Sequence, residues 1–241
     1  MSTPDDVVVA EDLRRTHGRG ATKVAAVDGI SLRLPRASFT VVLGASGAGK
    51  TTLLHLLAGL EAPDAGTVTV GGVDLASLNE ASRTVFRRRY IGLVFQHSEL
   101  VPYLTARSNL LLPYLLDKRD PDPAWMDRLT RALGIHERLE QLPGQLSGGE
   151  EQRVALGRAL ATKPEVLIAD EPHGNLDVRQ GEQVLRLLRS TTDRFGQTVL
   201  LATHDPRAIG FADRVLVLRD GVVAHDISSP DVDHVTGLLA S

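Results

Sequence analysis

The stretch VVLGASGAGKTTLLHLL, residues 41–57, decides the fold of this chain. An apolar run over residues 39–43 leads into the glycine-rich loop GASGAGKTT, residues 44–52, and a leucine-rich helix is expected over residues 53–60. The spacing G-x-x-x-x-G-K-[ST] between a strand and a helix is the P-loop pattern. Glycines let the backbone curl so that its N–H groups point at an anion, and the helix N-terminus adds partial positive charge. The stretch therefore predicts a site for the phosphates of a nucleoside triphosphate.

The residues of this loop have separate expected roles. Lys50 brings a full positive charge to the β- and γ-phosphates, the Thr51 hydroxyl can ligate Mg²⁺, and Thr52 can reach the α-phosphate. A glycine-rich turn that binds nothing is the alternative, and the Lys-Thr pair after a strand argues against it. The positions expected to contact the nucleotide are Gly44, Ala45, Ser46, Gly47, Ala48, Gly49, Lys50, Thr51 and Thr52.

The composition is that of a globular α/β protein and excludes several other classes. The chain has 241 residues, 42% of them hydrophobic, which suffices for one large α/β domain or two small ones. It has no cysteine, so a disulfide framework and a cysteine-based metal site are excluded. A net charge of -3 means that the chain has no excess of basic residues of the kind that binds nucleic acid, so we expect no nucleic-acid partner. Because the acidic N-terminus is no signal peptide and no apolar run is long enough to span a bilayer, we expect a cytoplasmic protein.

The order of strand and helix signals predicts one nucleotide-binding domain with a helical insertion. Strands are predicted over residues 7–10, 30–34, 39–43, 66–73, 90–95, 166–169, 198–202, 214–219 and 222–225. Helices are predicted over residues 53–60, 78–89, 151–160 and 178–195. Residues 98–145 read as helical with proline and glycine breaks, and residues 227–241 are weakly patterned. We therefore expect a single domain over residues 1–241. It would comprise an α/β P-loop NTPase core with a mixed, mainly parallel sheet and an antiparallel N-terminal part (1–96 and 156–228), an inserted all-helical subdomain (97–155) and a tail (229–241).

Polar side chains follow several of the predicted strands. Residues 166–171, VLIADE, are an apolar run that ends in two carboxylates, and ligands collect at the carboxyl ends of parallel strands. Asp170 is expected to hold Mg²⁺. Glu171, which alternation along the strand turns to the other side, could orient or deprotonate the attacking water. Gln96 and His204 end two further strands, so Gln96 can touch Mg²⁺ or its waters and His204 can reach the γ-phosphate.

The segment QLSGGE, residues 145–150, runs directly into a predicted helix. Ser147 can cap this helix, and Gly148 and Gly149 allow a close approach of the backbone. The segment thus builds a second anion-binding helix N-terminus, but no lysine follows as in a P-loop. It would suit a clamp on the γ-phosphate of a nucleotide held elsewhere, although Ser-Gly-Gly alone is also a common helix start.

Taken together, these motifs resemble the ATPase of ABC transporters. The resemblance rests on GASGAGKTT, Gln96, LSGGE, VLIADEP, GNLD (residues 174–177) and THD (residues 203–205), in that order and spacing, over about residues 6–225. LSGGE is the specific element, because P-loop kinases and GTPases lack it. The short GNLD segment and the single-domain layout are similar to the lipoprotein-release and macrolide-efflux branch of the family, which also contains a cell-division relative.

The resemblance implies a head-to-tail dimer that encloses two ATP molecules. Ser147 and Gly149 of one copy would close on the ATP held by Lys50 of the other, with Asp177 at the same interface. Gln96 would connect the site to the helical insert, where a membrane permease docks. Residues 100–109, LVPYLTARSN, would form part of that dock, although core packing explains their apolar content equally well.

Three positions depart from the family pattern. His17 stands where the family has an aromatic residue that stacks on adenine, and histidine can stack with a smaller face. His173 replaces the usual Thr or Ser after Glu-Pro, so an added pH dependence is possible. Glu151 replaces the usual Arg or Gln and adds negative charge to the first turn of a helix. None of these departures removes an expected catalytic residue.

The resulting expectation is an ATP-hydrolysing, Mg²⁺-dependent subunit that drives a separate membrane permease, for export or extraction, from the inner face of the cell membrane. Two alternatives stay open at this point. The first is a regulatory ATPase that transmits force through a membrane partner without moving a substrate. The second is an ABC protein that acts on ribosomes or DNA, against which the acidic charge and the absence of a second nucleotide domain argue.

Overall fold

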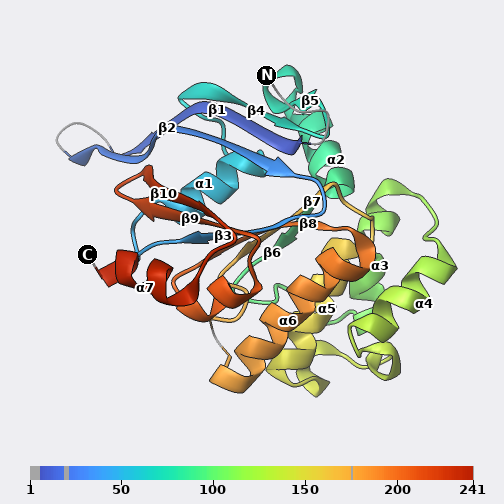
Figure 1. Ribbon diagram of the computed structural model, residues 1–241. Coiled ribbons are helices and arrows are strands. Elements are labelled where there is room, and N and C mark those ends of the chain that lie inside the picture. The colour runs from blue at the N-terminus through green and yellow to red at the C-terminus, as the bar shows by residue number, and fades with distance from the viewer. Residues whose placement is uncertain (1–5, 19–21, 175, 241) are drawn as a thin grey trace.

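A six-stranded sheet forms the centre of the computed structural model, which describes residues 6–18, 22–174 and 176–240 (Figure 1). Its strand order is β10-β9-β3-β8-β7-β6; all neighbouring strands run parallel except β10, which is antiparallel to β9. The strands are β3 (Phe39–Leu43), β6 (Ile91–Val94), β7 (Val166–Asp170), β8 (Thr198–Thr203), β9 (Arg214–Arg219) and β10 (Val222–Ser228). The predicted mixed, mainly parallel sheet is confirmed.

A second, antiparallel sheet with the order β2-β1-β4-β5 lies over one face of the first (Figure 1). Its strands are β1 (Asp6–His17), β2 (Val24–Pro35), β4 (Ala65–Val70) and β5 (Val73–Asp74). The predicted antiparallel N-terminal part is confirmed, but β1 and β2 pair well beyond the apolar residues that marked them. The predicted strand over residues 66–73 is instead a hairpin, turned by Gly71 and Gly72 at positive φ.

Helix α1 (Lys50–Leu57) packs between the two sheets. Its leucines share one hydrophobic core with the antiparallel sheet and with alternate residues of the central strands, such as Val42 and Leu200. Every residue of β3 is buried, as expected for a parallel strand covered on both faces. The strand, loop and helix of the P-loop pattern are therefore rigidly held by the centre of the fold.

The opposite face of the central sheet is covered mainly by helices, which include those that follow β6 (Figure 1). The helices beyond α1 are α2 (Glu80–Tyr90), α3 (Ala106–Asp117), α4 (Pro123–Ala132), α5 (Gly148–Leu160), α6 (Val178–Phe195) and α7 (Val232–Ala240). Short 3₁₀ helices are η2 (Leu75–Ser77), η3 (His136–Arg138), η4 (Pro143–Gln145) and η5 (Pro206–Phe211). Between β6 and β7 the described chain forms helices and turns only, as the sequence predicts.

The weakly patterned tail contains structure that the sequence pattern did not indicate. Strand β10 continues to Ser228, and α7 follows it. Val235 of α7 is fully buried in the core, Leu239 packs against the same core, and Val232 is exposed. None of the helices in the described part of the chain combines the length and the apolar character needed to cross a membrane.

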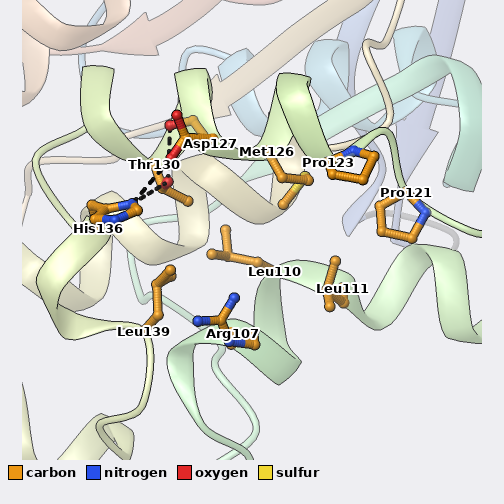
Figure 2. Close-up of a pocket in the computed structure, with 10 residues that line it drawn as sticks. All are labelled: Arg107, Leu110, Leu111, Pro121, Pro123, Met126, Asp127, Thr130, His136 and Leu139. Carbon is orange, nitrogen blue, oxygen red and sulfur yellow. Dashed lines mark hydrogen bonds and ion pairs between the residues drawn. The ribbon is translucent and has the colours of Figure 1, made fainter.

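A pocket of 290 Å³ lies within the helical insert, between α3 and α4 (Figure 2). Figure 2 shows Leu110 and Met126 converging on it from the two helices. Its charged groups have partners, because Arg107 pairs with Glu140 and Asp127 pairs with Arg131. None of the predicted site residues lines it.

Candidate functional site

Most of the predicted site residues line one pocket of 790 Å³ at the carboxyl edge of the central sheet. The pocket brings together the P-loop and the ends of strands β6, β7 and β8, as the strand-end argument predicts. Its lining residues are His17, Val24, Ala26, Ala45, Ser46, Gly47, Gly49, Lys50, Thr51, Thr52, Gln96, Asp170, Glu171 and His204.

The P-loop turns into α1 at Gly49, which has a φ of 100°. A Cβ added at Gly49 would lie 2.0 Å from the carbonyl oxygen of Ala26, so only glycine fits against the antiparallel sheet here. Lys50 begins the helix, and its Nζ donates to the carbonyl oxygens of Gly44 at 2.7 Å and Ala45 at 3.0 Å. The loop thus holds its own ammonium group at the pocket, beside the backbone of the first turn of α1.

Two predicted loop positions, Gly44 and Ala48, do not line this pocket. They lie on the other side of the loop, where a Cβ added at Gly44 would come 2.6 Å from the carbonyl oxygen of Leu218 in β9. Ala48 is buried. Both therefore have a packing role in the described structure, and their contact with a nucleotide stays a prediction.

Asp170, the last residue of β7, has the surroundings that favour a cation. Its Oδ1 atom is buried and has no hydrogen-bond partner among the described residues. Burial raises the pKa of this carboxyl group, against the opposing effect of a hydrogen bond with the Thr51 side chain. A divalent cation would satisfy the unpaired oxygen and compensate the cost of burying the charge, so the residues present fit Mg²⁺.

The described residues hold no group of three or more His, Cys, Asp or Glu side chains that could bind a metal by themselves. Mg²⁺ in nucleotide sites is commonly held by one or two carboxylates together with waters and substrate phosphates. Gln96 lines the same pocket, and its side chain lies against Gly174, where an added Cβ would be 2.9 Å from the amide nitrogen of Gln96. The candidate ligands Thr51, Gln96 and Asp170 are thus brought to one pocket.

Glu171 does not point away from Asp170 as alternation along a strand predicts. Strand β7 ends at Asp170, and Glu171 has a φ of 45°, a left-handed conformation that breaks the alternation. Both carboxylates therefore line the pocket. The Thr203 hydroxyl donates to Glu171 Oε2 at 2.8 Å, and the backbone N–H of His204 donates to Oε1 at 2.9 Å.

The side chain of His204 contacts the same carboxylate, because its Nδ1 lies 2.8 Å from Glu171 Oε1. A carboxylate can only accept, so Nδ1 is the donor in this pair. The rest of the imidazole is exposed at the mouth of the pocket. Glu171 and His204, whose roles were predicted separately, are thus in direct contact.

His17 ends β1 at the pocket, where its Nε2 lies 3.2 Å from the Thr52 hydroxyl oxygen. Beside it, Val24 and Ala26 of β2 add an apolar surface that the sequence interpretation missed. His17 pairs with Val24 across the antiparallel sheet, so the register of β1 and β2 is the signal that would have found them. Arg19 and Gly20 of the predicted connector lie outside the described residues.

Ser147, Gly149 and Asp177 do not line the pocket of their own chain. Ser147 caps α5, and Asp177 caps α6 by accepting from the backbone N–H of Gln180 at 2.8 Å. A Cβ added at Gly149 would lie 3.8 Å from the side chain of Gln180, so the two helix starts are neighbours. Gly149 of LSGGE and Asp177 of GNLD thus lie near each other outside the pocket; Asn175 of GNLD is outside the described residues.

The start of α5 is fixed by a capping box. Glu150 Oε2 accepts from the backbone N–H of Ser147 at 2.9 Å and from its hydroxyl at 2.8 Å. Glu150 Oε1 accepts from Arg138 Nε at 2.7 Å. The hydrogen bond from Arg138 and those from Ser147 lower the pKa of Glu150 to about 2. Glu151, the third departure from the family pattern, accepts from the Ser98 hydroxyl at 3.1 Å and so joins α5 to the segment after β6.

Comparison with known proteins identifies the family. Residues 27–174 match the family described as ABC transporter. The chain belongs to the ABC transporter family. It is an ATP-binding cassette of the ATPase type, the class that its motifs predict.

Several relatives place this ABC cassette within the family. An uncharacterised ABC transporter ATP-binding protein of Methanocaldococcus jannaschii is 37% identical over 224 residues, which cover 92% of this chain and 100% of the relative. The lipoprotein-releasing system ATP-binding protein LolD of Bordetella pertussis is 38% identical over 231 residues, which cover 94% of this chain and 100% of LolD. The macrolide export ATP-binding/permease protein MacB of Rhodopirellula baltica is 39% identical over 89% of this chain but only 32% of MacB.

A solved structure of similar fold is a dimeric ATP-binding cassette in a post-hydrolysis state, bound to ADP and Pi. It has a TM-score of 0.81 and 32% sequence identity to this ABC cassette, and the match covers 93% of this chain and 99% of the other. The similarity supports the predicted lipoprotein-release and macrolide-efflux branch and the predicted fold class.

Proposed function

We propose that this chain is the ATP-hydrolysing subunit of an ABC transporter that binds two ATP molecules between two copies of itself and drives a separate membrane permease. The gathering of Lys50, Asp170 and Glu171 in one pocket carries this proposal. The relatives named for lipoprotein release and macrolide export support export or extraction from the membrane as its task. No finding favours a regulatory ATPase that moves no substrate.

The first task of the site is to bind the phosphates. Lys50 and the backbone N–H groups at the start of α1 provide positive charge, and Thr52 lies within the same loop. Thr51, Asp170 and Gln96 would hold Mg²⁺, which when bound neutralises charge on the phosphates. His17, with Val24 and Ala26 beside it, offers a surface on which the adenine can lie.

The second task is to prepare water for attack. Glu171 is largely buried and its two oxygens already accept hydrogen bonds, so its carboxylate has a fixed direction at the pocket. A carboxylate held in this way can orient a water molecule and accept its proton. His204 donates from Nδ1 to Glu171, which leaves the exposed part of its ring to face the phosphate end of the nucleotide.

The third task is to form the complete site from two copies. Ser147 and Gly149 lie at a helix N-terminus outside their own pocket, next to Asp177 at the start of α6. In a head-to-tail dimer this surface would cover the ATP that the partner holds at Lys50. The solved dimer of a similar cassette supports this arrangement.

The permease would dock on the helical insert, residues 97–155, and so hold the chain at the inner face of the cell membrane. Tyr103 has an exposed fraction of 80%, in the segment where docking is expected. Asn109 is buried and bonds to the backbone of Val101 and Leu104, which gives that segment a defined shape. Gln96 lies four residues before this segment, so movement of the segment would reach the pocket. The permease should copurify with the chain from membranes in mild detergent, and an active ATPase without any membrane partner would contradict this part.

Steady-state hydrolysis by the purified protein tests the chemical part. Glu171→Gln should lower kcat at least about a hundredfold, because the general base is lost, while ATP still binds. The matched control is Glu182→Gln, the same change at an exposed ion pair on α6, which should leave kcat unchanged. If Glu171→Gln hydrolyses ATP at the wild-type rate, Glu171 is not the general base.

A further inference from the structure

His173 lies in the turn after β7 and has an exposed fraction of only 5%. Its Nε2 is 3.3 Å from the Thr203 hydroxyl oxygen and 3.4 Å from Oδ2 of Asp205. Neither His173 nor Thr203 lines the nucleotide pocket. The imidazole is therefore placed behind the site, in contact with a residue that itself holds Glu171.

The hydrogens around Thr203 can be assigned from its partners. A hydroxyl has one hydrogen and two lone pairs, and the Glu171 carboxylate can only accept, so the Thr203 hydrogen goes to Glu171 Oε2. The backbone N–H of Asp205 donates to Thr203 Oγ1 at 3.0 Å. One lone pair of the hydroxyl remains, so His173 Nε2 can bond to Thr203 only as a donor, and Asp205 Oδ2 at 3.4 Å is a second acceptor for the same hydrogen.

The other ring nitrogen supports the same assignment. His173 Nδ1 is buried and has no hydrogen-bond partner among the described residues. A proton on Nδ1 would be a buried donor without an acceptor, which is costly, so the neutral ring places its proton on Nε2. Burial lowers the pKa of His173 and favours this neutral form, with Asp205 and Glu171 acting in the opposite direction and Arg207 and His204 adding to the lowering.

We propose that His173 is a positioning residue for Glu171: it donates to Thr203 and thereby forces the Thr203 hydrogen toward the carboxylate that prepares the water. The inference rests on the proposed role of Glu171. It gives a task to a residue at which this chain departs from the Thr or Ser of its family.

The chain of contacts continues from His173 to a helix. Asp205 accepts from Arg207 Nε at 2.9 Å, and Arg207 Nη1 donates to the carbonyl oxygen of Val178 in the first turn of α6 at 3.0 Å. Helix α6 also packs against the imidazole at Gly181, where an added Cβ would lie 3.5 Å from His173 Cβ. The ring is thus held from both sides and can hold Thr203 in turn.

Two amide variants separate this role from simple packing. Glutamine places its amide nitrogen near the position of a histidine Nε2, whereas the asparagine amide is one bond shorter. His173→Asn should lower kcat for ATP hydrolysis about fivefold to tenfold, the effect of one lost hydrogen bond, with KM within about twofold because the pocket lining is unchanged. His173→Gln should retain kcat within about twofold.

A double-mutant cycle with Thr203→Val completes the test. Thr203→Val alone should lower kcat without changing KM, and adding His173→Asn to it should cause no further loss, because the contact is already broken. Equal losses in the Asn and Gln variants, losses that multiply in the double variant, or a change in KM alone would overturn the inference. If the Asn variant does not fold, His173→Met, which fills the space of the ring but has no donor, takes its place in the cycle: it should lower kcat alone and cause no further loss in Thr203→Val, and a loss that multiplies would overturn the inference.

Glu171→Gln, measured in parallel, distinguishes a failure of the proposed role of Glu171 from a failure of the proposed role of His173. If Glu171→Gln retains turnover, the proposed chemical role of Glu171 fails, and this inference fails with it. If Glu171→Gln is inactive while His173→Asn has the wild-type kcat, only the role of His173 is wrong.

Discussion

Replacing Glu150 by glutamine tests how the LSGGE helix is held. Glutamine can still serve in a capping box with Ser147, but it loses the ion pair with Arg138. The shift of the Glu150 pKa from 4.5 to about 2 would correspond to at most about 3 kcal/mol. Because the Arg138 side chain is 41% exposed and solvent weakens the pair, we expect Glu150→Gln to lower the free energy of unfolding by about 1 kcal/mol at neutral pH.

The pH dependence of this loss has a definite sign. The folded-state pKa of Glu150 is lowered, so its contribution is complete above the unfolded value of 4.5 and is lost as the pH falls toward about 2. Urea unfolding of wild type and Glu150→Gln should therefore give a difference that is largest at neutral pH and shrinks at about pH 3.5.

The matched control for that experiment is Glu182→Gln, which removes an exposed ion pair with Arg186 on α6 and should cost less than about 0.5 kcal/mol. A Glu150 variant as stable as wild type at neutral pH, or a difference that grows as the pH falls, would refute the reasoning.

Three other changes have definite expected outcomes. Gly49→Ala should abolish ATP binding in a fluorescent-nucleotide assay, because the new methyl group would lie 2.0 Å from the Ala26 carbonyl oxygen, and retained affinity would contradict the loop geometry. Asp170→Asn should raise the thermal midpoint in EDTA at neutral pH, because the wild-type pKa is raised and ionisation there opposes folding, yet it should remove Mg²⁺-dependent hydrolysis. An unchanged or lower midpoint would show that the buried charge is compensated. His17→Tyr should lower the KM for ATP about threefold if position 17 stacks on the base, and an unchanged KM would place the base elsewhere.

The site residues that sequence reasoning found share a simple physical origin. Asp170 ends an apolar strand, His204 directly follows one, and Lys50 follows another after the glycine-rich loop. Because parallel strands end at one edge, detecting the strands brings these residues together. The orientation of Glu171 could not be obtained in this way. It depends on the left-handed backbone conformation of Glu171 itself, directly after β7, which a pattern of apolar residues does not predict.

The features that were missed depend on pairing between distant segments. Val24 and Ala26 reach the pocket only through the register of β1 and β2. Polar residues within these two strands interrupt the apolar pattern by which strands are predicted. Helix α7 packs on the core through Val235. The burial of Val235 depends on tertiary contacts and cannot be read from the periodicity of the sequence. The placement of His173 behind Glu171 likewise needs the positions of Thr203 and α6.

Gly149 lies outside the pocket of its own chain, and in the proposed dimer it would complete the site of the second copy. Gly149→Asp offers a selective perturbation of that contribution. Acidic residues are favourable in the first turn of a helix, and the added Cβ would have ordinary contact with Gln180 at 3.8 Å, so the fold should be retained. The same carboxylate would repel the phosphates of an ATP bound by the partner.

The most direct measurement of the composite site is the molar mass of Glu171→Gln in saturating ATP, by light scattering on a sizing column. We expect a shift from 26.0 kDa to about 52 kDa, twice the chain mass, when ATP is added. Glu171→Gln combined with Gly149→Asp should bind ATP and remain at 26.0 kDa. A Glu171→Gln protein that binds ATP as a monomer, or a double variant that still dimerises on ATP, would contradict the claim that each pocket is completed by the LSGGE segment of a second copy.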